Sequence, residues 1–213
     1  MPRFAAMFIA LFILPRAISA DPWTFIKSQE GIHVYARRVK GFRQKQFRST
    51  ARINHPVVRV LAVLQDIERY PEFIPSYERM SIFKRIAGKD ETIFHVYGVF
   101  KGPFVSRRDT VLSIRAKFRR SDDEPGKITG AVIMMKNIKH PQYPKKEHIR
   151  LPYFRGLMRL KSIADGRSTN ITSVMHVVPG GWIPAGLLNF IGSYDAIETI
   201  RAIRKRCDWL ASH

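Results

Sequence analysis

Polar and hydrophobic residues alternate with a period of two through much of residues 30–180, the pattern of strands that bury one face and expose the other. Gly41 and the Pro125-Gly126 pair interrupt the alternation as turn residues do. We predict strands over residues 32–37, 46–53, 77–86, 92–100, 109–118, 127–135, 147–150, 156–163 and 170–178. So many strands in succession predict one large antiparallel sheet.

Three segments are predicted to be helical. Residues 22–26 form a short helix candidate at the start of the domain. Pro56 begins a second helix, because proline fits the first helical turn, and Pro71 ends it. The last helix begins at Pro184 and runs to about Leu210, roughly 40 Å at 1.5 Å per residue. Its apolar stripe comprises Leu187, Leu188, Ile191, Tyr194, Ile197 and Ile200.

The order of these elements predicts an α+β fold over residues 21–213. A large sheet needs a cover for its apolar face, and the final helix needs a partner for its apolar stripe. We therefore expect a curved antiparallel sheet wrapped around the long C-terminal helix.

Residues 1–20 have the order of a secretory signal peptide. A positive start that ends at Arg3 precedes an uncharged apolar run over residues 4–14, and small residues follow Pro15. The apolar run is short for a membrane span, although an uncleaved anchor is the alternative. We predict cleavage after about Ala20, or after Ser19, and a periplasmic or secreted protein.

Charge and cysteine content limit the partners and chemistry of the chain. A single cysteine among 213 residues excludes an intramolecular disulfide framework and a multi-cysteine metal site. The formal charge is +20, from 37 Lys and Arg against 17 Asp and Glu, which favours an anionic partner. No motif for entering a nucleic-acid groove accompanies the basic residues. We therefore predict transient contact with an anionic membrane surface, no nucleic-acid partner and a monomer.

A strongly curved sheet can stand away from its helix and leave a hollow between the two layers. Two strands and the final helix then supply the expected lining, which is apolar with a few hydrogen-bonding groups. The residues expected to bind the ligand are Ile93, His95, Tyr97, Thr110, Leu112, Ile114, Leu187, Ile191 and Tyr194. Periodicity fits an ordinary packed core equally well, and that alternative stays open.

Two loops are candidates for a gate that touches the membrane. One carries Phe104, Val105 and Arg107 after a Gly-Pro pair, and the other carries Phe73 and Ile74 between two prolines. Apolar tips with cations beside them suit an interfacial contact. Packing of the same side chains over the end of the core is the alternative.

Four segments resemble motifs of the START (steroidogenic acute regulatory protein-related lipid transfer) domain family. They are residues 31–37 (GIHVYAR), 66–75 (DIERYPEFIP), 102–109 (GPFVSRRD) and 178–184 (VPGGWIP), in the order and spacing of the family. The resemblance implies a helix-grip fold that holds one lipid between sheet and C-terminal helix, with no catalytic machinery. The seven histidines are scattered without metal-ligand spacing, so we expect no metal site, and we expect no cofactor.

The resemblance also locates a possible polar anchor. Steroid-binding relatives pair a buried carboxylate with an Arg on the neighbouring strand, and these positions fall on His95 and Ile114 here. Both are changed, so His95 with Tyr97 is the substitute to test. Two other functions remain as rivals: a cyclase or hydrolase on the same fold, and a periplasmic protein-interaction module with a packed core.

Overall fold

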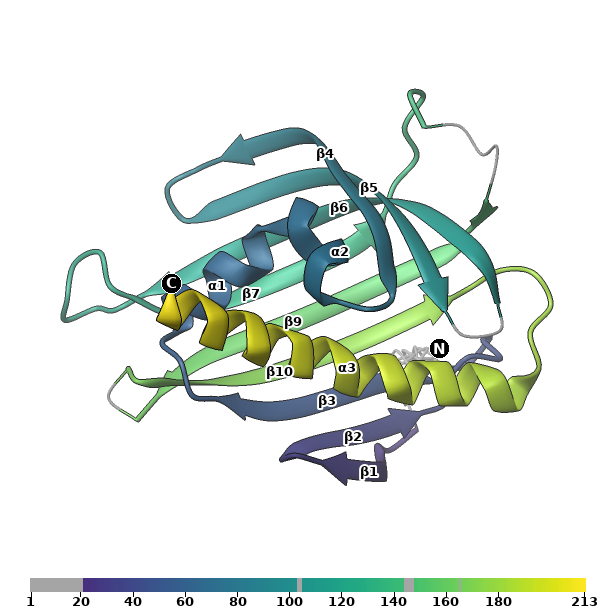
Figure 1. Cartoon of the computed structure of the whole chain (residues 1–213), viewed down its shortest axis with the longest axis horizontal. Helices are drawn as coiled ribbons and strands as arrows, with labels where there is room; N and C mark the ends of the chain where they lie inside the picture. Colours follow the sequence, from purple (N-terminus) through teal and green to yellow (C-terminus); the bar gives the residue numbers. More distant parts are fainter. Residues whose placement is uncertain (1–20, 103–104, 144–147, 165) are drawn as a thin grey trace, which may run out of the picture.

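The computed structural model describes residues 21–102, 105–143, 148–164 and 166–213. Within these residues, ten strands form one sheet in the order β1-β2-β3-β10-β9-β7-β6-β5-β4, and the short β8 pairs with β6 (Figure 1). The strands are β1 (Thr24–Gln29), β2 (Ile32–Arg37), β3 (Gln46–Ile53), β4 (Tyr77–Ala87), β5 (Glu91–Gly102), β6 (Val105–Arg120), β7 (Ile128–Asn137), β8 (Ile149–Arg150), β9 (Tyr153–Ile163) and β10 (Ser168–Val178). Only the β6–β8 pair is parallel among the described strands.

Helices cover one face of this sheet. They are α1 (Val57–Gln65), the 3-10 helix η1 (Ile67–Arg69), α2 (Tyr70–Phe73) and α3 (Ala185–Ser212). The last, drawn in yellow, crosses the sheet with α1 and α2 on the same side (Figure 1). At 28 residues it is about 42 Å long. It packs on β2, β3, α1 and α2.

The core lies between the concave face of the sheet and these helices. From α3 it contains Ile197, Ile200 and Ile203, each at most 2% exposed, and the Cys207 thiol. Burial raises the pKa of that thiol to about 12, so Cys207 is a packing residue. The sheet is curved and antiparallel, and its edge strands are not paired with each other in the described chain. The predicted helix-grip architecture is confirmed.

The start of the domain differs from its prediction. Residues 22–26 were expected to be helical, but Thr24–Gln29 is the edge strand β1, paired with β2. A helix this short makes few internal hydrogen bonds. A tight turn with positive φ at Glu30 (52°) and Gly31 (68°) instead returns the chain as a hairpin. The local hairpin therefore overrides the weak helical signal.

The predicted signal peptide, residues 1–20, lies outside the described residues. Among the residues that are described, no helix is both long enough and apolar enough to cross a bilayer.

Candidate functional site

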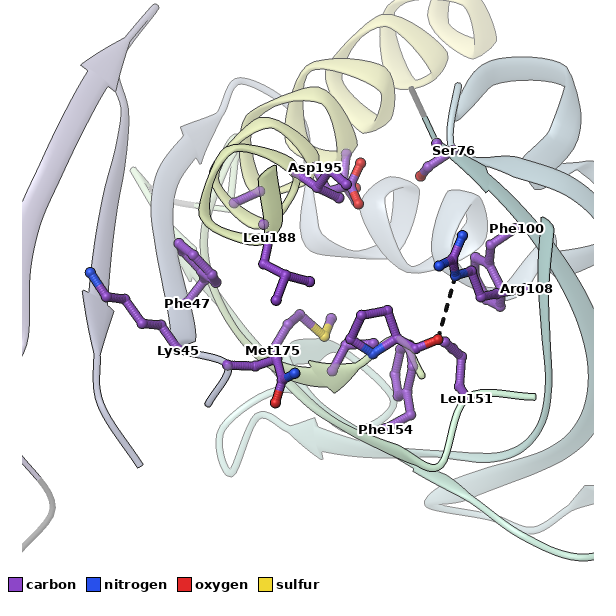
Figure 2. Close-up of a pocket in the computed structure, with 18 of the residues that line it drawn as sticks. Lys45, Phe47, Ser76, Phe100, Arg108, Leu151, Phe154, Met175, Leu188 and Asp195 are labelled. Atoms are coloured by element: carbon purple, nitrogen blue, oxygen red, sulfur yellow. Dashed lines mark hydrogen bonds between the residues drawn. The ribbon is translucent and has the colours of Figure 1, made fainter. Parts of the chain in front are cut away.

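A cavity of about 220 Å³ lies between α3 and the concave face of the sheet (Figure 2). Its wall is mostly apolar: Phe47 comes from β3, Phe154 and Met158 come from β9, and Met175 comes from β10. The remaining described residues that line it are Gln44, Lys45, Ser49, Ser76, Tyr77, Phe100, Lys101, Gly102, Val105, Arg108, Leu151, Ser173, Val177, Pro179, Ile183, Leu188, Asn189, Ile191, Gly192, Asp195, Ala196, Thr199 and Ile200.

Gly192 sets how α3 approaches the wall. A Cβ at this position would lie 2.3 Å from Cε2 of Phe47, far inside van der Waals contact. Glycine thus lets the Phe47 ring lie against the helix backbone. The helix and sheet meet at this point, and the cavity lies beside the contact.

Arg108 brings a buried cation into the apolar cavity. Its residue is 7% exposed, and the guanidinium points into the cavity from β6 (Figure 2). Nε donates to the carbonyl oxygen of Pro179 at 3.4 Å, and Nη1 donates to that of Ser106. Both acceptors are neutral, and within the described chain no carboxylate lies within salt-bridge distance of Arg108. Burial lowers its pKa.

Asp195 projects a carboxyl group from α3 into the same cavity (Figure 2). Burial, followed by repulsion from Glu198, raises its pKa to about 7. Tyr77, also in the lining, has its pKa raised by burial and then by Asp195. Among the described residues, the Asp195 carboxyl has neither a hydrogen bond nor an ion pair. A carboxylic acid that is half protonated near neutral pH therefore faces an apolar hollow.

Asp109, next in sequence to Arg108, is on the opposite face of β6, since successive strand residues alternate. Its carboxylate accepts two hydrogen bonds from Arg150, at 2.7 and 2.9 Å, and one from the Tyr97 hydroxyl at 3.1 Å. The Asp109 residue is only 2% exposed. This ion pair fixes β6 and β8 directly behind the cavity wall.

Asp195 is expected to make stability fall as pH rises. The pKa of Asp195 is near 3.8 in the unfolded chain and about 7 in the folded protein. The folded protein therefore binds this proton more tightly, and the stability that the proton contributes is lost as pH rises from about 4 to 7. We expect Asp195→Asn to raise the free energy of unfolding at pH 8 by about 2 kcal/mol. This is half of the free energy that the raised pKa of Asp195 implies, because burial of the new Asn amide also has a cost. Urea titrations at pH 5 and pH 8 measure this gain. Glu198→Gln removes only the smaller cause of the raised Asp195 pKa and should give a smaller gain, so an equal gain in both variants would contradict the assignment to Asp195.

The predicted lining of β5 is wrong. Thr92, Phe94 and Val96 face the core, so Ile93, His95 and Tyr97 lie on the outer face. There, Tyr97 stacks on Tyr143 with centroids 4.7 Å apart, and Phe83 contacts His95 and His140. His95 with Tyr97 is therefore not the anchor inside the cavity. Because an aromatic cluster covers its outer face, β5 has apolar residues on both faces. The alternation alone could not show which of the two faces the core.

The β6 residues Thr110, Leu112 and Ile114 lie on the expected inner face but do not line the cavity. They are buried in the close-packed part of the core, opposite Gly98, Val96 and Phe94 respectively. The Thr110 hydroxyl has no hydrogen-bond partner among the described residues. The prediction placed the hollow too far along the strand, because the core and the hollow share one face.

On α3, Ile191 lines the cavity as predicted, whereas Leu187 and Tyr194 do not. Tyr194 stacks on the exposed Phe190 at 5.9 Å and lies toward the outer side of the helix. The apolar stripe predicted for this helix was therefore rotated by about one residue from the face that lines the hollow. That face includes the polar Asp195, which the search for an apolar stripe passed over.

The predicted gate residues do not share one environment. Phe104 lies outside the described residues, and Val105 lines the cavity. Arg107 faces solvent and pairs with Glu78 at 2.7 Å. Ile74 is 2% exposed and belongs to the core, so its prediction as a membrane contact is wrong.

Phe73 also packs against the core. Its ring lies 5.7 Å from Tyr70 and beneath the Arg206 guanidinium.

Sequence reasoning missed the exposed aromatic residues beside the cavity. Trp182 is 82% exposed and Phe190 is 50% exposed, at the N-terminal end of α3. A second hollow, lined by Arg43, Trp182 and Leu188 among others, adjoins the first. The signal was present: Phe190 is an apolar residue off the buried stripe, and Trp182 occupies a turn where a large apolar side chain has no local purpose.

A curved antiparallel sheet covered by one long helix, with an apolar hollow between them, defines the helix-grip fold. The chain belongs to the START domain family, whose model matches residues 6–211. START domains bind lipids and other hydrophobic ligands, and this chain shares their fold.

Relatives cover nearly the whole chain. An uncharacterised protein of Pseudomonas aeruginosa is 23% identical over 209 residues, which cover 97% of this chain and 96% of that protein. Mitochondrial steroidogenic acute regulatory protein of Ovis aries is 27% identical over 195 residues, covering 86% of this chain and 66% of that protein. The crystal structure of a STAR-related lipid transfer protein fragment from Xanthomonas axonopodis has a TM-score of 0.70 and 25% identity, covering 88% of this chain and 99% of that one.

Proposed function

We propose that the protein takes up one lipid, or a similar apolar molecule, in the cavity beneath α3 and carries it between membranes. The observation behind this proposal is the hollow itself, bounded by Phe47, Phe154, Met158, Met175 and Ile191. Interiors normally pack with few voids, so an apolar hollow of this size supports the binding of an apolar molecule. Burial of the ligand's apolar surface supplies about 25 cal/mol per Å².

The exposed aromatic residues beside the cavity support a membrane-docking role. Trp182 and Phe190 are apolar bodies on the surface, and Arg43, Lys45 and Lys101 lie near the same end of the cavity. Aromatic rings favour the headgroup level of a bilayer, and each Lys or Arg near an anionic surface adds about 1 kcal/mol. In this proposal, docking loosens the N-terminal part of α3 near Leu188 and Ile191, which line the cavity, so that the ligand can enter.

Location and assembly are part of the same proposal. The positive start, apolar run and small residues of residues 1–20 support export and removal of this segment. The proposed protein then acts in the periplasm or outside the cell, as a monomer, and needs neither cofactor nor turnover of its ligand.

Native mass spectrometry of the purified protein, followed by organic extraction, tests lipid binding directly. We expect the protein to carry a bound lipid whose mass the spectrum gives, or to take up one lipid per protein from vesicles. Conversion of the bound molecule to a new product would favour the cyclase or hydrolase. Absence of uptake from any lipid mixture would favour the protein-interaction module and overturn the proposal.

The docking surface gives a second prediction. The double variant Trp182→Ala, Phe190→Ala should bind anionic phosphatidylglycerol vesicles about thirtyfold more weakly, since each ring contributes roughly 1 kcal/mol when half buried at the interface. Vesicle co-sedimentation measures the change. Trp209→Ala removes an exposed Trp (44%) from the opposite end of α3 and should have little effect. An equal loss in both variants would show that vesicle binding does not depend on the cavity end.

A further inference from the structure

The titratable groups that line the cavity have an uneven charge. Within the described residues they are Lys45, Tyr77, Lys101, Arg108 and Asp195. Three are cations, Tyr77 is neutral because burial raises its pKa, and Asp195 is the single acid. The cavity therefore presents net positive charge to whatever enters it.

Arg108 has unused donor capacity inside this cavity. A guanidinium carries five N–H groups, and the bonds from Nε and Nη1 to backbone carbonyls leave Nη2 without an acceptor in the described chain. A buried cation without an anion is costly. Arg108 is therefore complementary to a negatively charged ligand group.

Asp195 projects into the same cavity from the opposite wall, on α3, where Figure 2 shows its carboxyl group on the side of Ser76 and Arg108. The two groups are not within ion-pair distance of each other. Among the described residues, the titratable groups that interact with Asp195 are Glu198 on α3, which is bonded to Arg201, and Tyr77 on β4. In its protonated form, Asp195 offers an O–H donor to an anion held at Arg108.

The hollow is also small. Sites for drug-sized ligands span about 300–1,000 Å³, and this one measures about 220 Å³. One acyl chain matches the volume better than a lipid with two.

We propose that Arg108 and Asp195 form a recognition site for the anionic end of a single-chain lipid, a carboxylate or a phosphate ester, whose chain fills the apolar remainder of the cavity. This inference rests on the proposed lipid-binding function. Arg108 donates to the anion from the sheet, and protonated Asp195 donates from α3. Ionised Asp195 repels the anion, so binding weakens as pH rises through the range in which Asp195 loses its proton.

Calorimetry with three probes of equal chain length tests this site: dodecanoate, dodecyl phosphate and the neutral dodecan-1-ol. At pH 6 the protein should bind at least one anion about tenfold more tightly than the alcohol, since a hydrogen bond to a charged group contributes enough for that ratio. Comparison of the two anions separates carboxylate from phosphate as the natural end group. Arg108→Gln should remove the preference, and Arg107→Gln, a matched change on the solvent face, should keep it.

Measuring affinity at two pH values isolates the contribution of Asp195 to binding. Dodecanoate affinity of the unmodified protein should fall about tenfold between pH 6 and pH 8, because one proton on Asp195 is linked to binding. Asp195→Asn keeps a neutral donor and should flatten the dependence, while Glu198→Gln should keep a dependence whose midpoint lies at lower pH, because it removes one cause of the raised Asp195 pKa. If Arg108→Gln does not fold, the Asp195→Asn comparison alone decides.

Equal affinity for dodecanoate, dodecyl phosphate and dodecan-1-ol would overturn the anionic site but leave lipid binding intact. Tight binding of two-chain lipids with no uptake of any dodecyl probe would also overturn it. Binding of no lipid of any kind would instead overturn the proposed function.

Discussion

Asp109→Ala is expected to lower the free energy of unfolding by about 3–5 kcal/mol, the cost of breaking a buried ion pair by removing one partner. Asp109 is 2% exposed and holds both Nε and Nη2 of Arg150. It also accepts from the Tyr97 hydroxyl. The substitution therefore removes the carboxylate that three donors share, behind the strand that carries Arg108.

Urea unfolding at pH 7 measures this loss. Glu78→Ala is the matched control, because Glu78 pairs with the neighbouring Arg107 at a comparable 2.7 Å but on the surface. Exposed pairs contribute about 0–1 kcal/mol, so the control should change little. Similar losses in the two variants would mean that burial does not distinguish the two pairs. Tyr97→Phe, which removes one hydrogen bond and keeps the ring, should lose about 1 kcal/mol.

Most strands were predictable because alternation is a local property of the sequence. The predicted segment 92–100 is found as Glu91–Gly102, and 109–118 is found as Val105–Arg120. The added residues were missed where alternation ends: Ser106 and Arg107 are both exposed and lie where the ladder with β5 shifts register, between the pairs Phe100–Arg108 and Gly102–Val105. Backbone pairing in a hairpin persists beyond the residues whose side chains need burial.

The candidate site was less predictable, because the concave face is a property of the whole sheet. Outward-facing Tyr97 packs with Tyr143 and the inward-facing Val96 packs in the core, so each face of β5 has apolar residues. The hollow depends on contacts between segments far apart in sequence, such as Gly192 with Phe47. Asp195 and Arg108 have no spacing motif that relates them, since they come from different layers. Only the three-dimensional arrangement brings them to one cavity.

Ile191→Trp is expected to abolish lipid uptake, with an affinity loss of about a hundredfold or more, while leaving the fold intact. Ile191 lines the cavity from α3, and an indole there takes up part of a volume of only about 220 Å³. Because the larger side chain enters a void, the usual overpacking cost of about 1–3 kcal/mol should be largely avoided. Uptake of a fluorescent lipid and thermal unfolding measure the two effects separately.

Leu112 gives the sharpest comparison. The sequence predicted that Leu112 binds the ligand together with Ile191, but Leu112 is 2% exposed in the packed core and does not line the hollow. Leu112→Trp should therefore destabilise the fold by about 1–3 kcal/mol, since no void receives the ring. Phe190→Trp, next to Ile191 on the exposed side, should change neither property. Normal lipid uptake by a folded Ile191→Trp protein would contradict binding in this hollow, because the indole would occupy part of the space that the ligand needs.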